Sequence, residues 1–281
     1  MTSPESLIFY ALVLLATGIA VGFFCGLLGV GGGFLMVPVQ IWVLSLQGIE
    51  STLATRVAFA TSLAVVLPTA ISGCRGHACW GVVLWREGVI LGLFGMLGGF
   101  LGGSIASHAP GETLRMIFGV FVMLAAARML LIPNLQPRQE PDNRPKKSIF
   151  QYLIWGGAVG VISGLTGIGG GLMLVPIMIV VLGFSIYQAI GTSSVAISFN
   201  ALGGIAAYAI NGWGVQGLPS YCIGYIDLLQ FALLAISSIF AAPWGARAAH
   251  RLPAERLKQI FVVLMLYIGL KMIGALEWAG L

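Results

Sequence analysis

The feature that most constrains this chain is its shortage of charged residues. Only 14 Lys and Arg and 9 Asp and Glu occur among 281 residues, so charged side chains make up 8% of the chain, whereas soluble domains carry about 25%. A water-exposed surface cannot be built from so few charges. The composition, which is 58% hydrophobic, excludes a soluble enzyme and predicts an integral membrane protein.

The net charge of +5 does not indicate a nucleic-acid partner, because the basic residues are spread along apolar sequence and form no basic stripe. No metal site and no cofactor are expected, since the cysteines lack a CxxC spacing and buried thiols behave as small apolar groups. These cysteines are Cys25, Cys74, Cys79 and Cys222. Residues 1–7 contain Glu5 but no basic residue, so no cleaved signal peptide is expected and the N-terminus is predicted outside the cytoplasm.

Charges and turn residues divide the sequence into ten apolar stretches, which predict an all-α polytopic membrane protein. Most stretches are long enough for a spanning helix of about 17 to 25 residues, but the second and the seventh are too short. These two are predicted half-helices. The stretches are Leu7–Leu28, Gly33–Leu46, Thr52–Ser72, Gly88–Ser107, Thr113–Ile132, Ile149–Leu165, Gly170–Leu182, Tyr187–Ile210, Ile226–Ala249 and Leu257–Leu276.

The sequence divides into two halves that resemble each other. Residues 22–38, GFFCGLLGVGGGFLMVP, align with residues 160–176, GVISGLTGIGGGLMLVP, at a constant spacing of 138 residues. Ala58–Ser62 matches Ala189–Ser193, and the pattern P-x-E-x-L-K/R recurs at Pro110 and Pro253. We therefore predict a five-element repeat at 1–132, a charged, proline-rich linker at 133–148, and a second repeat at 149–281.

An odd number of crossings in each repeat predicts that the second repeat is inverted relative to the first. With both termini outside, the basic segment 75–86, the linker and the basic loop near Arg251 all face the cytoplasm, in agreement with the positive-inside rule. The alternative is eight spans, in which each short stretch and its neighbour form one broken helix and the repeats run parallel.

Each repeat carries a glycine run, Gly29–Gly33 and Gly167–Gly171, that breaks a helix inside the membrane. A half-helix beginning after such a break directs its free N–H groups and its positive dipole end into the protein, which suits an anion. The alternative reading is close helix packing, which is the favoured reading for the spaced glycines Gly22, Gly26 and Gly98–Gly103.

The two glycine signatures, each followed by a Thr-Ser pair, resemble the duplicated signature of the TauE/SafE family of sulfite and organosulfonate exporters. The resemblance covers essentially the whole chain. It implies a multi-pass carrier in the inner membrane for small sulfur-containing anions, such as sulfite, a sulfonate or thiosulfate, and it implies no enzymatic activity. It leaves the substrate and the direction of transport open, and the oligomeric state is unknown.

The candidate substrate-binding residues combine the glycine runs with polar side chains on the following elements. Ser and Thr hydroxyls in membrane helices also bond to their own helix, so this second reading stays open. Arg56 either pairs with a sulfonate or reaches the outer interface as a snorkelling side chain. The candidates are Gly29, Gly31, Gly32, Gly33, Arg56, Thr61, Ser62, Thr166, Gly167, Gly169, Gly170, Gly171, Thr192, Ser193 and Asn200.

Two other functions remain possible from the sequence. One is a membrane enzyme or sulfur-relay protein that uses Cys25 and His77, although no nucleophile, base and acid stand at a usable spacing. The other is a non-transporting membrane subunit that packs on a partner. Among the carboxylates, Asp227 alone is a candidate for proton coupling, and the membrane potential can drive an anion outward without a coupling ion.

Overall fold

The computed structural model describes residues 4–28, 31–131, 148–249 and 254–275. This part of the chain forms ten α-helices and one pair of two-residue antiparallel strands. The elements are α1 (Pro4–Leu28), α2 (Gly33–Leu46), α3 (Ser51–Ala78), α4 (Trp85–His108), α5 (Gly111–Leu131), α6 (Ile149–Thr166), α7 (Gly171–Val180), α8 (Ile186–Asn211), β1 (Cys222–Ile223), β2 (Ile226–Asp227), α9 (Leu228–Ala249) and α10 (Ala254–Met272).

The prediction of an all-helical multi-pass membrane protein is confirmed. Six helices in the described part are long and apolar enough to cross a membrane, namely α1, α3, α4, α6, α8 and α9, while α2 and α7 are short and apolar. Large apolar side chains cover the outside of the bundle, for example Leu97 on α4 and Phe240 on α9. An apolar outer surface of this kind is suited to lipid and not to water.

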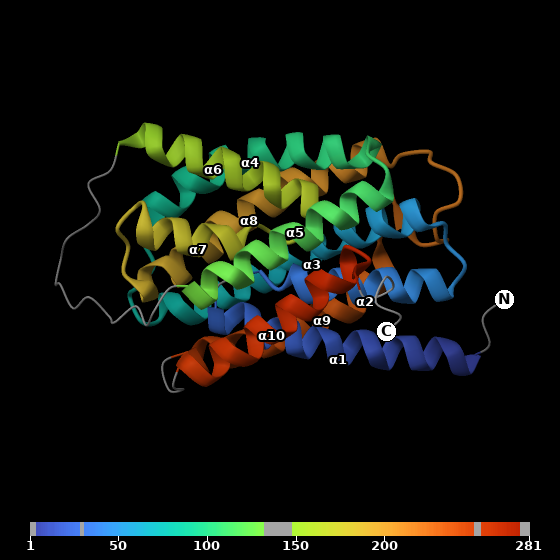
Figure 1. Ribbon diagram of the computed structural model, residues 1–281, viewed down its shortest axis with the longest axis horizontal. Coiled ribbons are helices and arrows are strands. Elements are labelled where there is room, and N and C mark those ends of the chain that lie inside the picture. The colour runs from blue at the N-terminus through green and yellow to red at the C-terminus, as the bar shows by residue number, and fades with distance from the viewer. Residues whose placement is uncertain (1–3, 29–30, 132–147, 250–253, 276–281) are drawn as a thin grey trace.

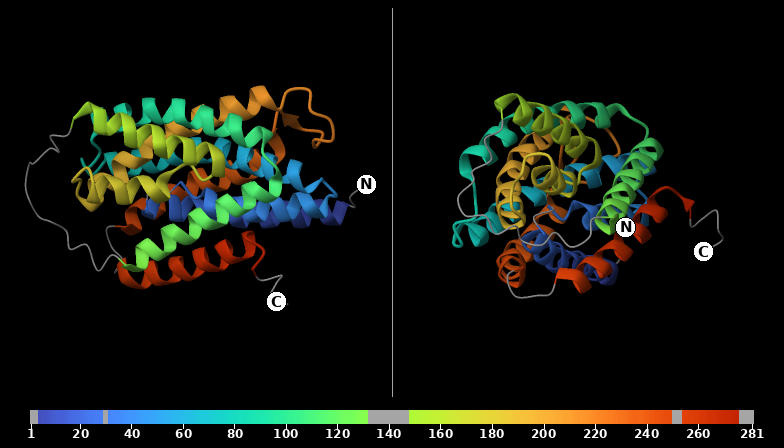
Figure 2. Two further views of the ribbon diagram at one scale, coloured as in Figure 1. Left: turned by 45° about the horizontal axis from the view of Figure 1, so that its top comes forward. Right: turned by 60° about the vertical axis from the view of Figure 1, so that its left-hand side comes forward.

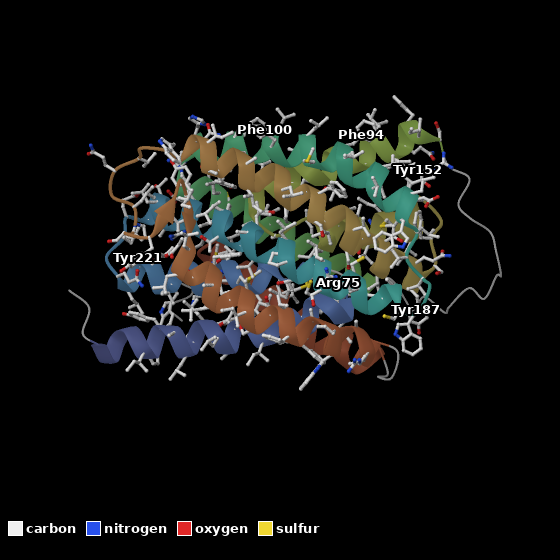
Figure 3. The ribbon with its side chains drawn as sticks, turned by 180° about the vertical axis from the view of Figure 1, so that it is seen from behind. Arg75, Phe94, Phe100, Tyr152, Tyr187 and Tyr221 are labelled. Atoms are coloured by element: carbon white, nitrogen blue, oxygen red, sulfur yellow. The ribbon has the colours of Figure 1, made fainter. Side chains whose placement is uncertain are left out.

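Tyrosines lie toward both ends of this bundle. Figure 3 shows Tyr152 and Tyr187 toward one end, and Tyr221 toward the other. Aromatic residues of this type favour the two membrane interfaces. The long axis of the bundle is therefore the natural direction of the membrane normal.

The central helices α3 and α8 are the most buried of the spanning helices, and the other elements are arranged around them (Figure 2). Helix α4 packs on α6 and α8, whereas α9 packs on α1 and α3. Helix α5 packs on α10. Exchanging each helix of the first five for the helix five places later along the chain reproduces this pattern of contacts.

Corresponding helices of the two halves run in opposite directions (Figure 1). Helix α1 begins at the right of the view, whereas α6 begins at the left. Helix α5 runs from right to left and α10 runs from left to right.

The spaced glycines of the first and fourth elements allow two pairs of helices to touch. A Cβ atom on Gly22 or Gly26 of α1 would collide with the backbone of Ser238 or Ala242 on α9. A Cβ atom on Gly98 or Gly102 of α4 would meet the backbone of α6 in the same way. Close packing, the reading favoured for these glycines, is what they provide.

The structure corrects the predicted start of the ninth element. The sequence placed this start at Ile226, but Ile226 and Asp227 pair as strand β2 with Ile223 and Cys222, and α9 begins at Leu228. Hydropathy did not distinguish the two because Ile226 is as apolar as the helix that follows it. The consequence is a small hairpin that packs on α3, α8 and α9.

Candidate functional site

The two glycine runs break the chain between a long helix and a short one in each half. Gly32 precedes α2 with φ 71°, and Gly170 precedes α7 with φ 83°, so both have the left-handed conformation. Gly31 and Gly169 also have positive φ values, as does Gly167 after α6. Side chains with a Cβ atom are strained in this region, which explains why glycine is required here. Gly29 lies outside the described residues.

These two breaks are in contact with each other. A Cβ atom on Gly33 would lie 2.6 Å from the carbonyl oxygen of Gly167, and one on Gly31 would lie 3.0 Å from that of Ile168. Gly31 and Gly169 both approach the same pair of side chains, Val66 near the middle of α3 and Ile197 near the middle of α8. Because Val66 and Ile197 are equivalent residues of the two halves, the breaks meet where the repeats meet, at the centre of the bundle.

Each break presents the start of a short helix to this centre. The Gly32 carbonyl accepts the N–H groups of Leu35 and Met36, and the Gly170 carbonyl accepts those of Met173 and Leu174. The N–H groups that precede these have no partner within an α-helix, and the positive dipole end lies beside them. The centre of the bundle is therefore favourable for negative charge without a charged side chain.

Ser62 links the two halves at the breaks. Its hydroxyl lies 2.6 Å from the Gly167 carbonyl oxygen and 2.9 Å from the Phe59 carbonyl oxygen of its own helix. The equivalent residue, Ser193, donates to the Ile190 carbonyl within α8 at 2.8 Å. Thr166 donates to the Ile162 carbonyl at 2.7 Å. Bonding to the residue's own helix is therefore observed for these hydroxyls, and Ser62 also holds the second break.

Thr61 and Thr192 each hold the start of another helix in place. Thr61 accepts a hydrogen bond from the backbone N–H of Asp227 at 2.9 Å, and Thr192 accepts one from the N–H of Leu84 at 2.9 Å. Asp227 directly precedes α9 and Leu84 directly precedes α4. The oxygen of each hydroxyl thus accepts a hydrogen bond within the protein, and the hydroxyl proton is available to a further acceptor.

Asn200 and Ser163 are buried polar groups beside the second break. Asn200 is 1% exposed and Ser163 is 0% exposed. A Cβ atom on Gly170 would lie 3.2 Å from Asn200 Nδ2 and 3.3 Å from Ser163 Cβ. Asn200 Oδ1 and Ser163 Oγ have no hydrogen-bond partner in the protein. Ser163 is not among the site residues predicted from the sequence, although its position as the counterpart of Cys25 within the glycine signature is a signal for it.

Arg56 lies on α3 one helical turn before Phe59, whose Cα atom would be 2.7 Å from a Cβ atom on Gly167. Its guanidinium is engaged by other groups. Its Nη2 donates to the Ala109 carbonyl at 2.9 Å, and its Nη1 donates to the Tyr225 hydroxyl at 3.3 Å. The guanidinium also lies 5.9 Å from the centre of the Tyr225 ring. It therefore connects α3 to the end of α4 and to the β1–β2 hairpin.

Cys25 and His77 lie near each other in the first half of the chain, through Gly26, the residue after Cys25. The His77 ring bonds through Nε2 to the Gly26 carbonyl at 2.8 Å, and Cys25 is a buried free thiol. No cluster of three or more His, Cys, Asp and Glu side chains capable of holding a metal occurs among the described residues.

Known proteins are similar to this chain over most of its length. A family model described as sulfite exporter TauE/SafE matches residues 14–272. A relative from Haemophilus influenzae, named "Probable membrane transporter protein", is 30% identical over 263 residues, which cover 94% of this chain and 98% of the relative. A second from Methanocaldococcus jannaschii is 25% identical over 270 residues, or 94% and 97% of the two chains, and also bears the name of a membrane transporter protein.

The Bacillus subtilis protein YunE is 22% identical over 275 residues, which cover 93% of this chain and 96% of the relative, and its printed name is of the same kind. No solved structure matches. The double glycine signature lies within the region that the family model matches. The chain belongs to the TauE/SafE sulfite exporter family.

Proposed function

We propose that this membrane transporter exports small sulfur-containing anions, of the sulfite, sulfonate or thiosulfate type, by alternating access. The anion is held near the middle of the membrane at the helix starts that follow the glycine breaks. Around it stand the glycines 29, 31–33, 167 and 169–171 with Thr61, Ser62, Thr166, Thr192, Ser193 and Asn200. Arg56 remains a candidate at the end of this path, where it meets Tyr225.

The observation that carries this proposal is the contact between the two breaks. Two half-helices of opposite halves begin at one central point, beside Gly33 and Gly167. Transporters built from repeats bind substrates in this way, with half-helix N-termini directed at anionic groups near mid-membrane. The family description and the relatives' names support transport, and the description supports sulfite as a substrate.

The proposed topology is an inverted pair of repeats in the inner membrane, with both termini outside and the linker in the cytoplasm. The opposite directions of α1 and α6 in Figure 1 support the inversion. In this orientation an anion leaving the cell moves down the membrane potential, which contributes about 2.3 kcal/mol per charge per 100 mV. Outward transport by this chain then needs no coupled ion.

The test is transport by the purified chain alone in liposomes. Liposomes loaded with sodium sulfite or sodium thiosulfate should release the anion faster when the protein is present, and an inside-negative potential should accelerate the release. Sodium acetate is the control anion. If the protein gave no flux of any sulfur anion but bound stably to a partner protein, it would instead be a non-transporting subunit.

The sulfur-relay alternative is separated from transport by the cysteines. Replacement of Cys25, Cys74, Cys79 and Cys222 by Ala should leave the anion flux unchanged, because the proposed binding uses no thiol. Loss of flux in this variant, with the protein still folded in the membrane, would favour thiol chemistry.

A further inference from the structure

The two glycine breaks are similar in backbone but different in their polar surroundings. In the second half, Ser163 and Asn200 flank Gly170, and each has a buried polar atom without a partner in the protein. Leaving a polar group unpaired in a buried place is unfavourable, and most buried polar groups in proteins are paired. The unpaired Ser163 hydroxyl can donate to a ligand, whereas the unpaired Asn200 Oδ1 can only accept. An unpaired hydroxyl donor beside a helix start therefore requires an explanation.

In the described part of the first half, the positions equivalent to Ser163 and Asn200 hold no such pair of unpaired groups. Cys25 takes the place of Ser163, and a thiol is a weak hydrogen-bonding group. Thr69 takes the place of Asn200, and its hydroxyl lies 2.7 Å from the Val65 carbonyl oxygen and 2.6 Å from the Ser238 hydroxyl. The residues around Gly32 are therefore either weakly polar or already paired.

The reason for this difference lies in the neighbouring helices. Ser238 on α9 provides a hydroxyl for Thr69. Its counterpart on α4 is Gly95, and a Cβ atom on Gly95 would collide with Asn200 Oδ1. Gly95 thus leaves room for the larger amide and offers it no side-chain partner. The first half thus has two hydroxyls paired with each other, Thr69 and Ser238, whereas the second half has an amide, Asn200, whose Oδ1 has no partner.

We propose, as a refinement of the function proposed above, that the anion binds at the second break alone. Ser163 donates from its unpaired hydroxyl, and Asn200 donates from its amide Nδ2, which lies 3.2 Å from the Cβ position of Gly170. The N–H groups at the start of α7 complete the site, and Asn200 Oδ1, an acceptor, takes no part in binding the anion. The first break is then a structural counterpart that lets the two halves pack and move. This inference rests on the proposed transport of anions.

The donors also indicate which anions suit this place. A hydroxyl, an amide and backbone N–H groups are neutral, and Arg56 is engaged by Ala109 and Tyr225. Neutral donors at a helix start bind oxyanions through several hydrogen bonds and the helix dipole. A compact headgroup with several oxygens, such as sulfite or a sulfonate, fits this donor set better than halide, which cannot engage separate donors through separate oxygens.

The experiment changes equivalent positions in the two halves. Ser163→Cys and Asn200→Thr give the second break the residues of the first. At the first break, Cys25→Ser introduces the serine of the second half, and Thr69→Val removes the hydroxyl at the position equivalent to Asn200. Each full-length variant is purified and its Tm is measured in rising sodium sulfite, with sodium chloride as the control salt. A ligand that binds the folded state raises the Tm by mass action.

For the second-half variants we expect the sulfite concentration for half-maximal stabilisation to rise about tenfold or more, as for loss of a hydrogen bond to a charged ligand. For the first-half variants, the sulfite concentration for half-maximal stabilisation should stay within about twofold of its value for the natural chain. Ser163→Ala, the smallest change, is the second variant if Asn200→Thr does not fold. The Tm without ligand reports folding directly.

An equal loss of sulfite affinity in both sets of variants would overturn the proposal of a single site, but not the proposed transport of anions. Losses confined to the first half would likewise overturn the single-site proposal. If the natural chain shows neither stabilisation by sulfite, thiosulfate or isethionate nor flux of them, the proposed function fails as well, so the two failures are distinguishable.

Discussion

The hydroxyl of Thr61 accepts a hydrogen bond from the backbone N–H of Asp227, 166 positions away in the chain, at 2.9 Å. The matching hydroxyl of Thr192 does the same for Leu84. In both halves, therefore, a threonine of a central helix, α3 or α8, holds the residue that directly precedes a neighbouring helix, α9 or α4. In each case a central helix of one half is joined to the start of a peripheral helix of the other half.

Replacement of these threonines should destabilise the protein. Thr61→Val or Thr192→Val keeps the shape but leaves a backbone N–H without its acceptor, which costs about 1 to 3 kcal/mol when buried. The measurement is the Tm in detergent. Thr17→Val is the control, since the Thr17 hydroxyl bonds only to Val13 of its own helix. Equal effects at Thr17 and Thr61 would contradict the anchoring role.

A bulky residue at a glycine break should abolish transport while the protein remains in the membrane. Gly170→Val combines a left-handed φ of 83° with a Cβ position 2.8 Å from Val159 Cγ1. The backbone strain alone costs about 1 to 3 kcal/mol. Gly32→Val meets Val21 in the same manner. Flux in liposomes and the amount of protein in the membrane are measured together.

The matched control for this change is Gly183→Val. Gly183 also has a left-handed φ, 76°, but nothing lies within 4 Å of its Cβ position. It should lose some stability through strain and keep its transport. If Gly170→Val transported as well as Gly183→Val, the break would have only a backbone role.

Arg56 should contribute to stability through its fixed contacts. Arg56→Lys keeps the charge but cannot reproduce the two separate bonds to Ala109 and Tyr225, because an ammonium lacks the planar fork of a guanidinium. We expect a lower Tm and an unchanged sulfite concentration for half-maximal stabilisation. Tyr225→Phe removes only the longer of the two bonds and should lower the Tm less. A changed anion affinity in Arg56→Lys would assign the residue to substrate recognition.

The pH dependence of stability should report Asp227, which lies just before the spanning part of α9. Burial raises the pKa of its carboxyl group above the ordinary value. The folded state then binds more protons than the unfolded state, so this contribution is complete below the unfolded pKa and is lost as the pH rises through the folded pKa. Asp227→Asn retains an acceptor for the N–H groups of Leu229 and Gln230 and should gain Tm relative to the natural chain as the pH rises from about 4.

Glu50 provides a control of opposite sign. The N–H groups of Thr52 and Leu53 bond to its carboxylate and lower its pKa. Its contribution is present above the unfolded pKa and is lost as the pH falls through the folded pKa. Glu50→Gln should therefore lose Tm relative to the natural chain at neutral pH, and the difference should shrink in acid. The same sign for both variants would contradict this assignment.

The sequence determined the features that depend on local chemistry. Scarce charge and ten apolar stretches predicted a helical membrane protein, because hydrocarbon excludes unpaired backbone and charged surface alike. Glycine runs predicted the breaks at Gly32 and Gly170, since left-handed backbone requires glycine. The internal match also identified Thr61 and Thr192 as equivalent residues.

Only the tertiary structure decided which group each polar side chain meets. Thr61 bonds to Asp227 and Ser62 to Gly167, partners more than a hundred positions away, and no local pattern specifies such a pairing. The same holds for Gly95, whose missing side chain leaves Asn200 Oδ1 unpaired. Periodicity selects the face of a helix that is buried, whereas packing between helices selects the atoms that touch, because close contact depends on the shapes of both surfaces.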